Sequence, residues 1–145
     1  MKSQHPTLSR VISTDYPSFI AVLFPVVFDI FTIYFFFTGN YSFQFFLPIA
    51  IVATIIGVPF LVKRYRIISS VFEAGIQTKG TVTNIGFFRG RGSVSYSYNV
   101  QGETQTSSNA INRNSHTRKL TVGQKVTVVV DRDDPKRAFI WEIYL

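Results

Sequence analysis

Residues Ser18 to Thr38 read SFIAVLFPVVFDIFTIYFFFT, and this stretch decides how the chain is built. Its only charged side chain is Asp29. A helix of this length rises about 30 Å, which is the thickness of the hydrocarbon core of a bilayer. We therefore predict a transmembrane helix here. The alternative is a buried helix of a soluble protein.

A second apolar stretch follows almost at once. Residues Phe43 to Val62 read FQFFLPIAIVATIIGVPFLV and carry no charge. Only residues 39–42 separate the two stretches, so two membrane helices would have to form an antiparallel hairpin over residues 18–62. The first stretch is too long to be the apolar core of a cleaved signal peptide.

The composition of the 145 residues divides the chain into two parts. Charged residues make up 16% of it, below the roughly 25% of an average soluble domain. The charges of residues 1–62 cancel, so the net charge of +7 lies in residues 63–145. The chain has no cysteine, which excludes disulfides, thiolate metal sites and a cysteine nucleophile. An apolar anchor joined to a basic domain is the simplest interpretation.

The positive charges near the apolar stretches predict the orientation. Lys63, Arg64 and Arg66 follow the second stretch directly and form a basic cluster at the inner leaflet. Lys2 and Arg10 precede the first stretch, whereas the connecting loop has no basic residue. Positive charge favours the cytoplasmic side. We therefore expect a multi-pass protein of the inner (plasma) membrane with both termini in the cytoplasm.

Asp29 is the unusual residue of the first apolar stretch. Ionised carboxylates are costly in the middle of a bilayer, and neither stretch contains a basic partner. Ala50, Ala53, Thr54 and Gly57 form a face of small residues on the second helix, which allows close helix packing. Three roles remain open for Asp29: a hydrogen bond to Thr54 within the hairpin, a contact with another subunit, or a proton or ion relay.

The remaining chain has the pattern of a β-domain. We assign residues 1–17 to a cytoplasmic tail, 63–75 to a helical linker and 76–145 to a cytoplasmic all-β domain. Residues 93–100 alternate strictly between apolar and polar, which indicates a half-buried strand. Further strands are expected over residues 80–88, 103–111, 126–130 and 138–145. About five antiparallel strands would form a small barrel or curled sheet of the oligomer-binding kind.

The sequence offers little for catalysis. Its two histidines lie in the N-terminal tail and in a polar loop, and no known nucleophile, zinc or phosphate-binding motif is present. The acidic residues Asp131, Asp133 and Asp134 precede Pro135, which is more typical of a turn than of a cation site. We expect no enzyme activity and no cofactor.

Two predicted loops carry exposed positive charge. The residues concerned are Arg89, Arg91, Arg113, Arg118 and Lys119. Facing the membrane, they would bind anionic lipid headgroups. Facing the cytosol, they would bind an acidic partner, or they form a solvated surface. A single Arg-Gly-Arg-Gly stretch is weak support for nucleic-acid binding.

Most of residues 18–145 resemble a known family. The similar stretches are Gly75 with Gly80-Thr81-Val82, residues 96–102, residues 122–128 and residues 131–135. They resemble the bacterial domain-of-unknown-function family three-five-nine-two. This resemblance implies two membrane helices followed by a small β-domain, and it implies no activity or catalytic residue.

Two functions are consistent with these features. The first is a non-enzymatic, membrane-anchored interaction module or accessory subunit, which binds other membrane proteins or itself. The second is a small sensor domain that recognises anionic lipid, nucleotide or nucleic acid at the membrane surface.

Overall fold

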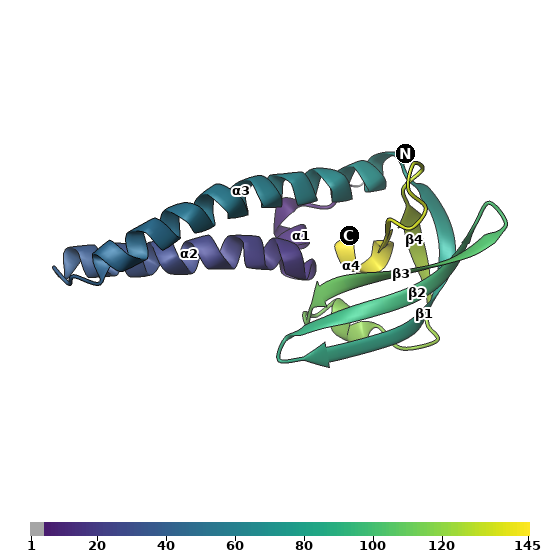
Figure 1. Cartoon of the computed structure of the whole chain (residues 1–145). Coiled ribbons are helices and arrows are strands. Elements are labelled where there is room, and N and C mark those ends of the chain that lie inside the picture. Colours follow the sequence, from purple (N-terminus) through teal and green to yellow (C-terminus); the bar gives the residue numbers. More distant parts are fainter. Residues whose placement is uncertain (1–4) are drawn as a thin grey trace.

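The computed structural model describes residues 5–145, so Lys2 lies outside the described residues. Two long helices project from a compact domain made of a curved sheet and short helices (Figure 1). The elements in chain order are α1 (Leu8–Thr14), α2 (Tyr16–Phe37), α3 (Phe43–Ala74), β1 (Ile76–Phe88), β2 (Arg91–Val100), β3 (Glu103–Asn112), η1 (Thr117–Lys119), β4 (Lys125–Val130), β5 (Ala138–Ile140) and α4 (Trp141–Tyr144).

Helices α2 and α3 form the predicted antiparallel hairpin. Both are long and apolar enough to cross a membrane, and only 11% of the most apolar part of each is buried. Gly39 adopts a φ of 66° in the connecting turn, a conformation that glycine reaches without strain. The large exposed apolar surface of this hairpin needs lipid or a partner to cover it.

Helix α3 continues beyond the apolar stretch into the β-domain. It ends at Ala74, one residue before the end of the predicted helical linker, and its last turns bury Ile68, Val71 and Phe72 in the core of the sheet. The apolar hairpin and the β-domain therefore share one uninterrupted helix (Figure 1).

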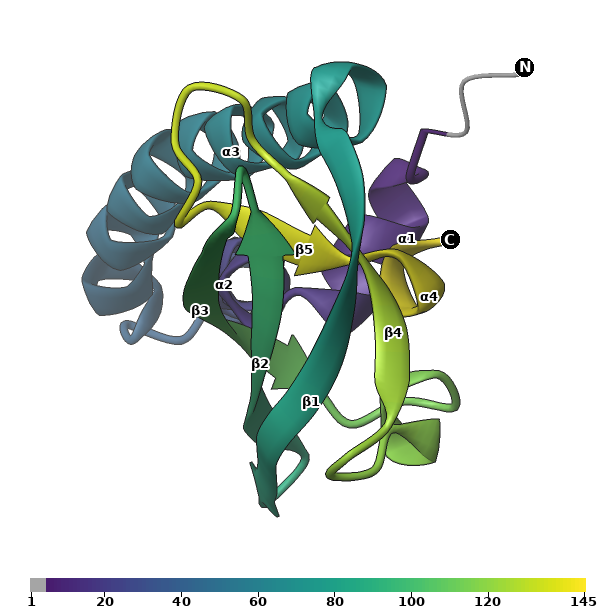
Figure 2. The same ribbon diagram turned by 90° about the vertical axis from the view of Figure 1, so that its right-hand side faces the viewer.

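The five strands form one antiparallel sheet in the order β3-β2-β1-β4-β5. Strand β1 pairs with β2 through its second half and with β4 through its first half, and it has a bulge between Val82 and Asn84. A bulge increases local twist and bending. The sheet curls into a nearly closed barrel (Figure 2), which confirms the predicted fold class.

Side chains fill the inside of this sheet. Tyr96, Val94, Val128 and Phe139 have at most 1% of their surface exposed. The hydroxyl group of Tyr96 donates to the carbonyl oxygen of Ala138 at 2.6 Å. Burial raises the pKa of Tyr96 well above its ordinary value. Tyr96 and Tyr98 of β2, both buried, therefore belong to the core of the domain.

Two sequence-based predictions need correction. Residues 8–14 are not part of a tail, since they form α1, whose Val11 is fully buried in the core. The strand expected over residues 138–145 ends at Ile140, and the chain then turns into α4. The short helix buries Ile143 and Tyr144 against the same core.

Candidate functional site

A buried ion pair joins the two helices of the hairpin. The carboxylate of Asp15, which has no exposed surface, accepts hydrogen bonds from Arg64 Nε at 3.1 Å and Arg64 Nη2 at 2.8 Å. This is the two-pronged geometry in which arginine pairs most strongly with a carboxylate. Asp15 lies at the start of α2 and Arg64 lies in α3, so the pair fixes the end of the hairpin that meets the β-domain.

Other groups complete the surroundings of Asp15. Its side chain caps α2 by accepting from the backbone N–H of Ser18 at 3.1 Å and from the Ser18 hydroxyl at 2.7 Å. The hydroxyl of Tyr144 in α4 donates to it at 3.3 Å. Burial and the neighbouring carboxylate raise the pKa of Tyr144 well above its ordinary value. The C-terminal helix is thus tied to the same ion pair.

Sequence analysis did not find this site. It placed Arg64 in a basic cluster at the membrane surface with Lys63 and Arg66. In the structure the Arg64 guanidinium pairs with Asp15, while Lys63 and Arg66 are exposed. The position of the three residues at the inner leaflet stays a prediction. The capping role of Asp15 was readable from the Asp-Tyr-Pro-Ser order, because an acidic cap followed by an early proline is typical of a helix start.

The small residues of α3 lie between the two helices. Ala50 and Gly57 are buried there. A Cβ atom at Gly57 would lie 2.5 Å from the carbonyl oxygen of Ala21 and 2.8 Å from Pro25 Cγ. Glycine therefore allows the backbones to approach at this point.

Asp29 lies in the same interface. The hydroxyl of Thr54 points to Asp29 Oδ2 at 3.5 Å, the long limit of a hydrogen bond. Both side chains are half-buried. This contact corresponds to the first of the three roles considered for Asp29. The other two roles remain predictions.

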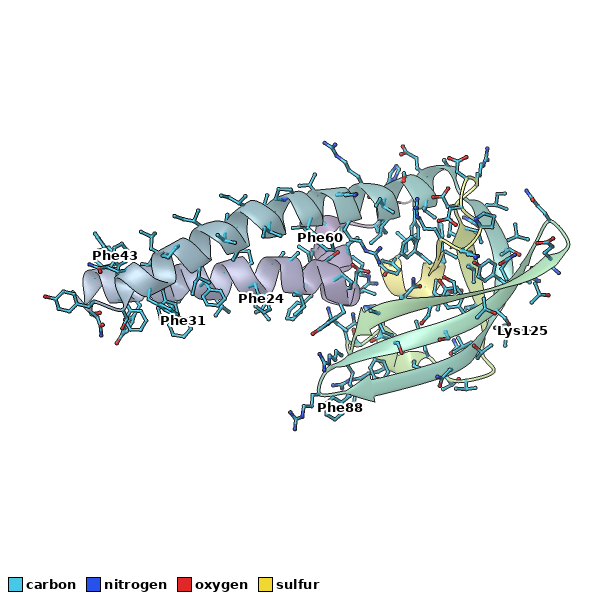
Figure 3. The ribbon with its side chains drawn as sticks, in the orientation of Figure 1. Phe24, Phe31, Phe43, Phe60, Phe88 and Lys125 are labelled. Atoms are coloured by element: carbon cyan, nitrogen blue, oxygen red, sulfur yellow. The ribbon has the colours of Figure 1, made fainter. Side chains whose placement is uncertain are left out.

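An apolar groove of about 470 Å³ lies between the two helices beside Gly57. Its walls come from both helices, and the first half of α2 contributes the larger share. The lining residues are Tyr16, Pro17, Ile20, Ala21, Phe24, Pro25, Ala53, Ile56, Gly57 and Phe60. Figure 3 shows Phe24 and Phe60 on neighbouring parts of the two helices.

The basic loop residues separate into two groups. Arg89, Arg91 and Arg113 lie beside the start of α2, where they line a second groove of about 670 Å³. Arg118 and Lys119 instead belong to the exposed part of η1 and do not line that groove. The structure thus brings together three of the five predicted anion-binding residues.

The loop that carries η1 is attached to α1. The side-chain amide of Asn114 donates to the carbonyl oxygen of Ser13 at 2.9 Å, and Arg10 Nη2 lies 3.3 Å from His116 Nδ1. Arg10 also donates to the backbone oxygen of Leu145 at 2.8 Å. Burial and the charge of Arg10 lower the pKa of His116. The contacts of His116 and Asn114 therefore hold this loop against α1.

The acidic residues before Pro135 form ion pairs and hydrogen bonds within their own loop. Arg137 forms ion pairs with Asp131 at 3.0 Å and with Asp134 at 3.5 Å. The backbone N–H of Asp133 donates to Asp131 at 3.0 Å. Within residues 5–145, no group of three or more His, Cys, Asp or Glu side chains is placed to hold a metal ion.

The fold and these contacts define a class of protein, namely two long apolar helices fixed to a nearly closed five-stranded sheet. The model of the family described as Domain of unknown function (DUF3592) matches residues 67–142, just over half of the chain. The chain belongs to this family. The match begins in the last turns of α3 and ends within α4, so it covers the whole five-stranded sheet. No curated protein and no solved structure matches the chain.

Proposed function

We propose that this protein is a membrane-anchored, non-enzymatic interaction module, an accessory subunit that binds another membrane protein through its helical hairpin. The groove beside Gly57 is the observation that carries this proposal. It is almost wholly apolar and lies within the stretch long enough to span a bilayer. A transmembrane helix of a partner subunit is the occupant that suits such a groove, because small residues at its floor permit close approach.

The structure of the β-domain supports a role at surfaces. Its interior is occupied by core side chains such as Tyr96 and Phe139, so a small molecule has no room inside the sheet. The alternative, a sensor domain, would have to recognise its ligand on the outside. The interaction module needs no such site.

The proposed location is the inner membrane, with the β-domain in the cytoplasm. The exposed Lys63 and Arg66 lie at the domain end of the hairpin, and the opposite turn over residues 38–42 carries no charge. Because the chain has no cysteine, single cysteines can report the orientation. In intact cells, Tyr41→Cys should react with a membrane-impermeant thiol reagent, whereas Asp133→Cys should not. The reverse pattern would overturn the proposed orientation.

The proposed function is tested by purifying the tagged full chain from its native membranes in mild detergent. We expect one membrane protein to co-purify at fixed stoichiometry. Ala53→Phe fills the groove and should release this partner. Val52→Phe adds similar bulk to a neighbouring side chain that is 55% exposed and does not line the groove, so it should retain the partner. Purification of the wild-type chain alone and monodisperse would contradict the proposal.

A further inference from the structure

The second groove lies between the start of α2 and the tip of the β1–β2 hairpin. One wall is the apolar side of α2, formed by Phe19, Ile20 and Leu23. The other wall is the hairpin tip with Arg89 and Arg91. The groove therefore has an apolar side and a positively charged side.

The strand pairing holds the positive charges together. The backbone N–H of Arg113 donates to the carbonyl oxygen of Gly90 at 2.8 Å, which fixes the loop after β3 to the hairpin tip. Arg91 Nη1 donates to the Tyr16 hydroxyl at 3.4 Å, which links the tip to α2. Three guanidinium groups thus converge on one groove although they come from different strands and loops.

These guanidinium groups lack acidic partners in the part of the chain that the structure describes. Each instead lies against an aromatic ring. The Cζ atom of Arg89 is 5.1 Å from the ring centre of Phe88. The Cζ atom of Arg91 is 6.0 Å from the ring centre of Tyr16, and that of Arg113 is 5.9 Å from the ring centre of Phe87. Stacking on an aromatic face leaves the N–H edge of a guanidinium directed elsewhere. Such an edge suits the oxygen atoms of a phosphate group.

The hairpin tip also carries an exposed aromatic side chain. Phe88 has 61% of its surface exposed, and Figure 3 shows it at the end of the hairpin that lies below the start of α2. The groove wall includes Leu23, two turns into α2, so the tip reaches alongside the first part of the apolar helix. With α2 in a bilayer, Phe88 would lie at the depth of the lipid headgroups, where aromatic residues are favoured.

We infer that this groove binds an anionic phospholipid of the adjacent leaflet, with its phosphate group at Arg89, Arg91 and Arg113 and an acyl chain along Phe19, Ile20 and Leu23. Charge complementarity selects the anionic headgroup. The apolar wall selects a ligand with a hydrocarbon chain, which neither a free phosphate nor a nucleotide has. The inference rests on the proposed membrane placement of α2, but it is independent of any protein partner.

Native mass spectrometry of the full chain in detergent tests the inference. The wild-type chain should retain phosphatidylglycerol in preference to phosphatidylcholine of the same chain length. Each arginine near the surface contributes about a fivefold gain in affinity, so Arg89→Asn combined with Arg91→Gln should weaken retention about 30-fold. Asparagine is chosen at position 89 because Arg89 has a φ of 49°, which asparagine tolerates well.

Arg118→Gln combined with Lys119→Gln is the matched control, because it removes the same charge from η1, outside the groove. It should retain the lipid as the wild type does. Should the hairpin-tip variant fail to fold, Arg113→Gln in the exposed loop supplies the second test, with about a fivefold loss.

Three results would overturn the inference: equal retention of the two lipids by the wild type, equal losses in the tip and control variants, or displacement of the lipid by inorganic phosphate alone. The last would assign the site to a free anion. A protein that retains the lipid at the tip but has no co-purifying partner would contradict the proposed function and leave this inference intact.

Discussion

Replacing Arg64 by methionine should destabilise the protein far more than replacing its exposed neighbour Lys63. Methionine keeps the length and apolar part of the arginine side chain but removes the positive charge. The carboxylate of Asp15, fully buried, would then lose both hydrogen bonds to the guanidinium. Lys63→Met is the matched control, since Lys63 is exposed and lies one position away.

The structure sets the size of the effect. Removing one member of a buried ion pair costs about 3–5 kcal/mol, because it leaves an uncompensated charge. Two hydroxyl groups and a backbone N–H still donate to Asp15, from Ser18 and Tyr144, so we expect the lower end, about 3 kcal/mol. In a chain of this size, that lowers the unfolding midpoint by roughly 10 °C.

The reciprocal change should cost less. In Asp15→Asn, the amide oxygen can still cap α2, and the side chain of Arg64, which is 26% exposed, can turn towards water. We expect about 1–2 kcal/mol. The double variant should be more stable than the sum of the two losses predicts, because the second change removes the charge that the first left unpaired.

Thermal unfolding of the full chain in mild detergent compares the wild type with Arg64→Met, Lys63→Met, Asp15→Asn and the double variant. The fluorescence of Trp141, the single tryptophan, reports the core directly, since its ring lies 5.5 Å from that of Phe72 in α3. If Arg64→Met and Lys63→Met unfold at the same temperature, or if the effects of Arg64→Met and Asp15→Asn simply add, the ion pair does not stabilise the contact between α2 and α3.

Three further predictions concern the core and the hairpin interface. Gly57→Val should lower the unfolding midpoint by forcing α2 and α3 apart at Pro25, at a cost of about 1–3 kcal/mol, whereas Val58→Ile on the exposed side should not. Burial raises the pKa of Tyr96, so this tyrosine ionises in the unfolded state before it ionises in the folded state. The free energy of unfolding should therefore fall as the pH rises above about 10. Denaturant titrations at several pH values should show a smaller fall for Tyr96→Phe. Asp29→Asn should leave the unfolding midpoint nearly unchanged, while Asp29→Leu should lower it slightly by removing the contact with Thr54. If Asp29 is instead a proton relay, both variants should abolish the same function.

Local sequence patterns predicted much of this fold because local physics determines it. The strict alternation in residues 93–100 places Val94 and Tyr96 on the buried face of β2. The turn at Gln101 and Gly102 has positive φ at both positions, 55° and 86°, as a two-residue hairpin loop requires. Such features need only neighbouring residues, so a single sequence reveals them.

The elements that sequence analysis missed depend on distant residues. Helix α1 has only seven residues, too short to be stable alone, and it forms because Val11 packs into a core supplied by later strands. In the last segment, the apolar residues at 139, 141 and 143 alternate as in a strand. The residues at 140, 143 and 144 equally suit one face of a helix, and in the structure all three are buried in the core.

The ion pair could not be predicted for a different reason. Asp15 and Arg64 are 49 positions apart and belong to different helices. Charge patterning near a membrane predicts where an arginine lies relative to the bilayer, but it does not reveal a carboxylate that the hairpin turn brings alongside. An arginine at position 64 is consistent both with a membrane surface and with a buried ion pair. Only the packing of α2 against α3 shows that Arg64 pairs with Asp15.

The contacts around this ion pair limit how the β-domain can move against the hairpin. A small domain joined to a helical hairpin by a loop can turn freely, but here α3 continues from the hairpin into the core without a break and buries Phe72 beneath the sheet. A rotation of the β-domain against the hairpin would have to bend α3 or separate Asp15, at the start of α2, from Tyr144 of α4 and from its backbone bridge with Ile111 of β3. Tyr144 and the cap on α2 add further donors to the same carboxylate. The hairpin grooves and the sheet are therefore held in one fixed relation, so a partner bound to the helices would meet the β-domain in a single orientation.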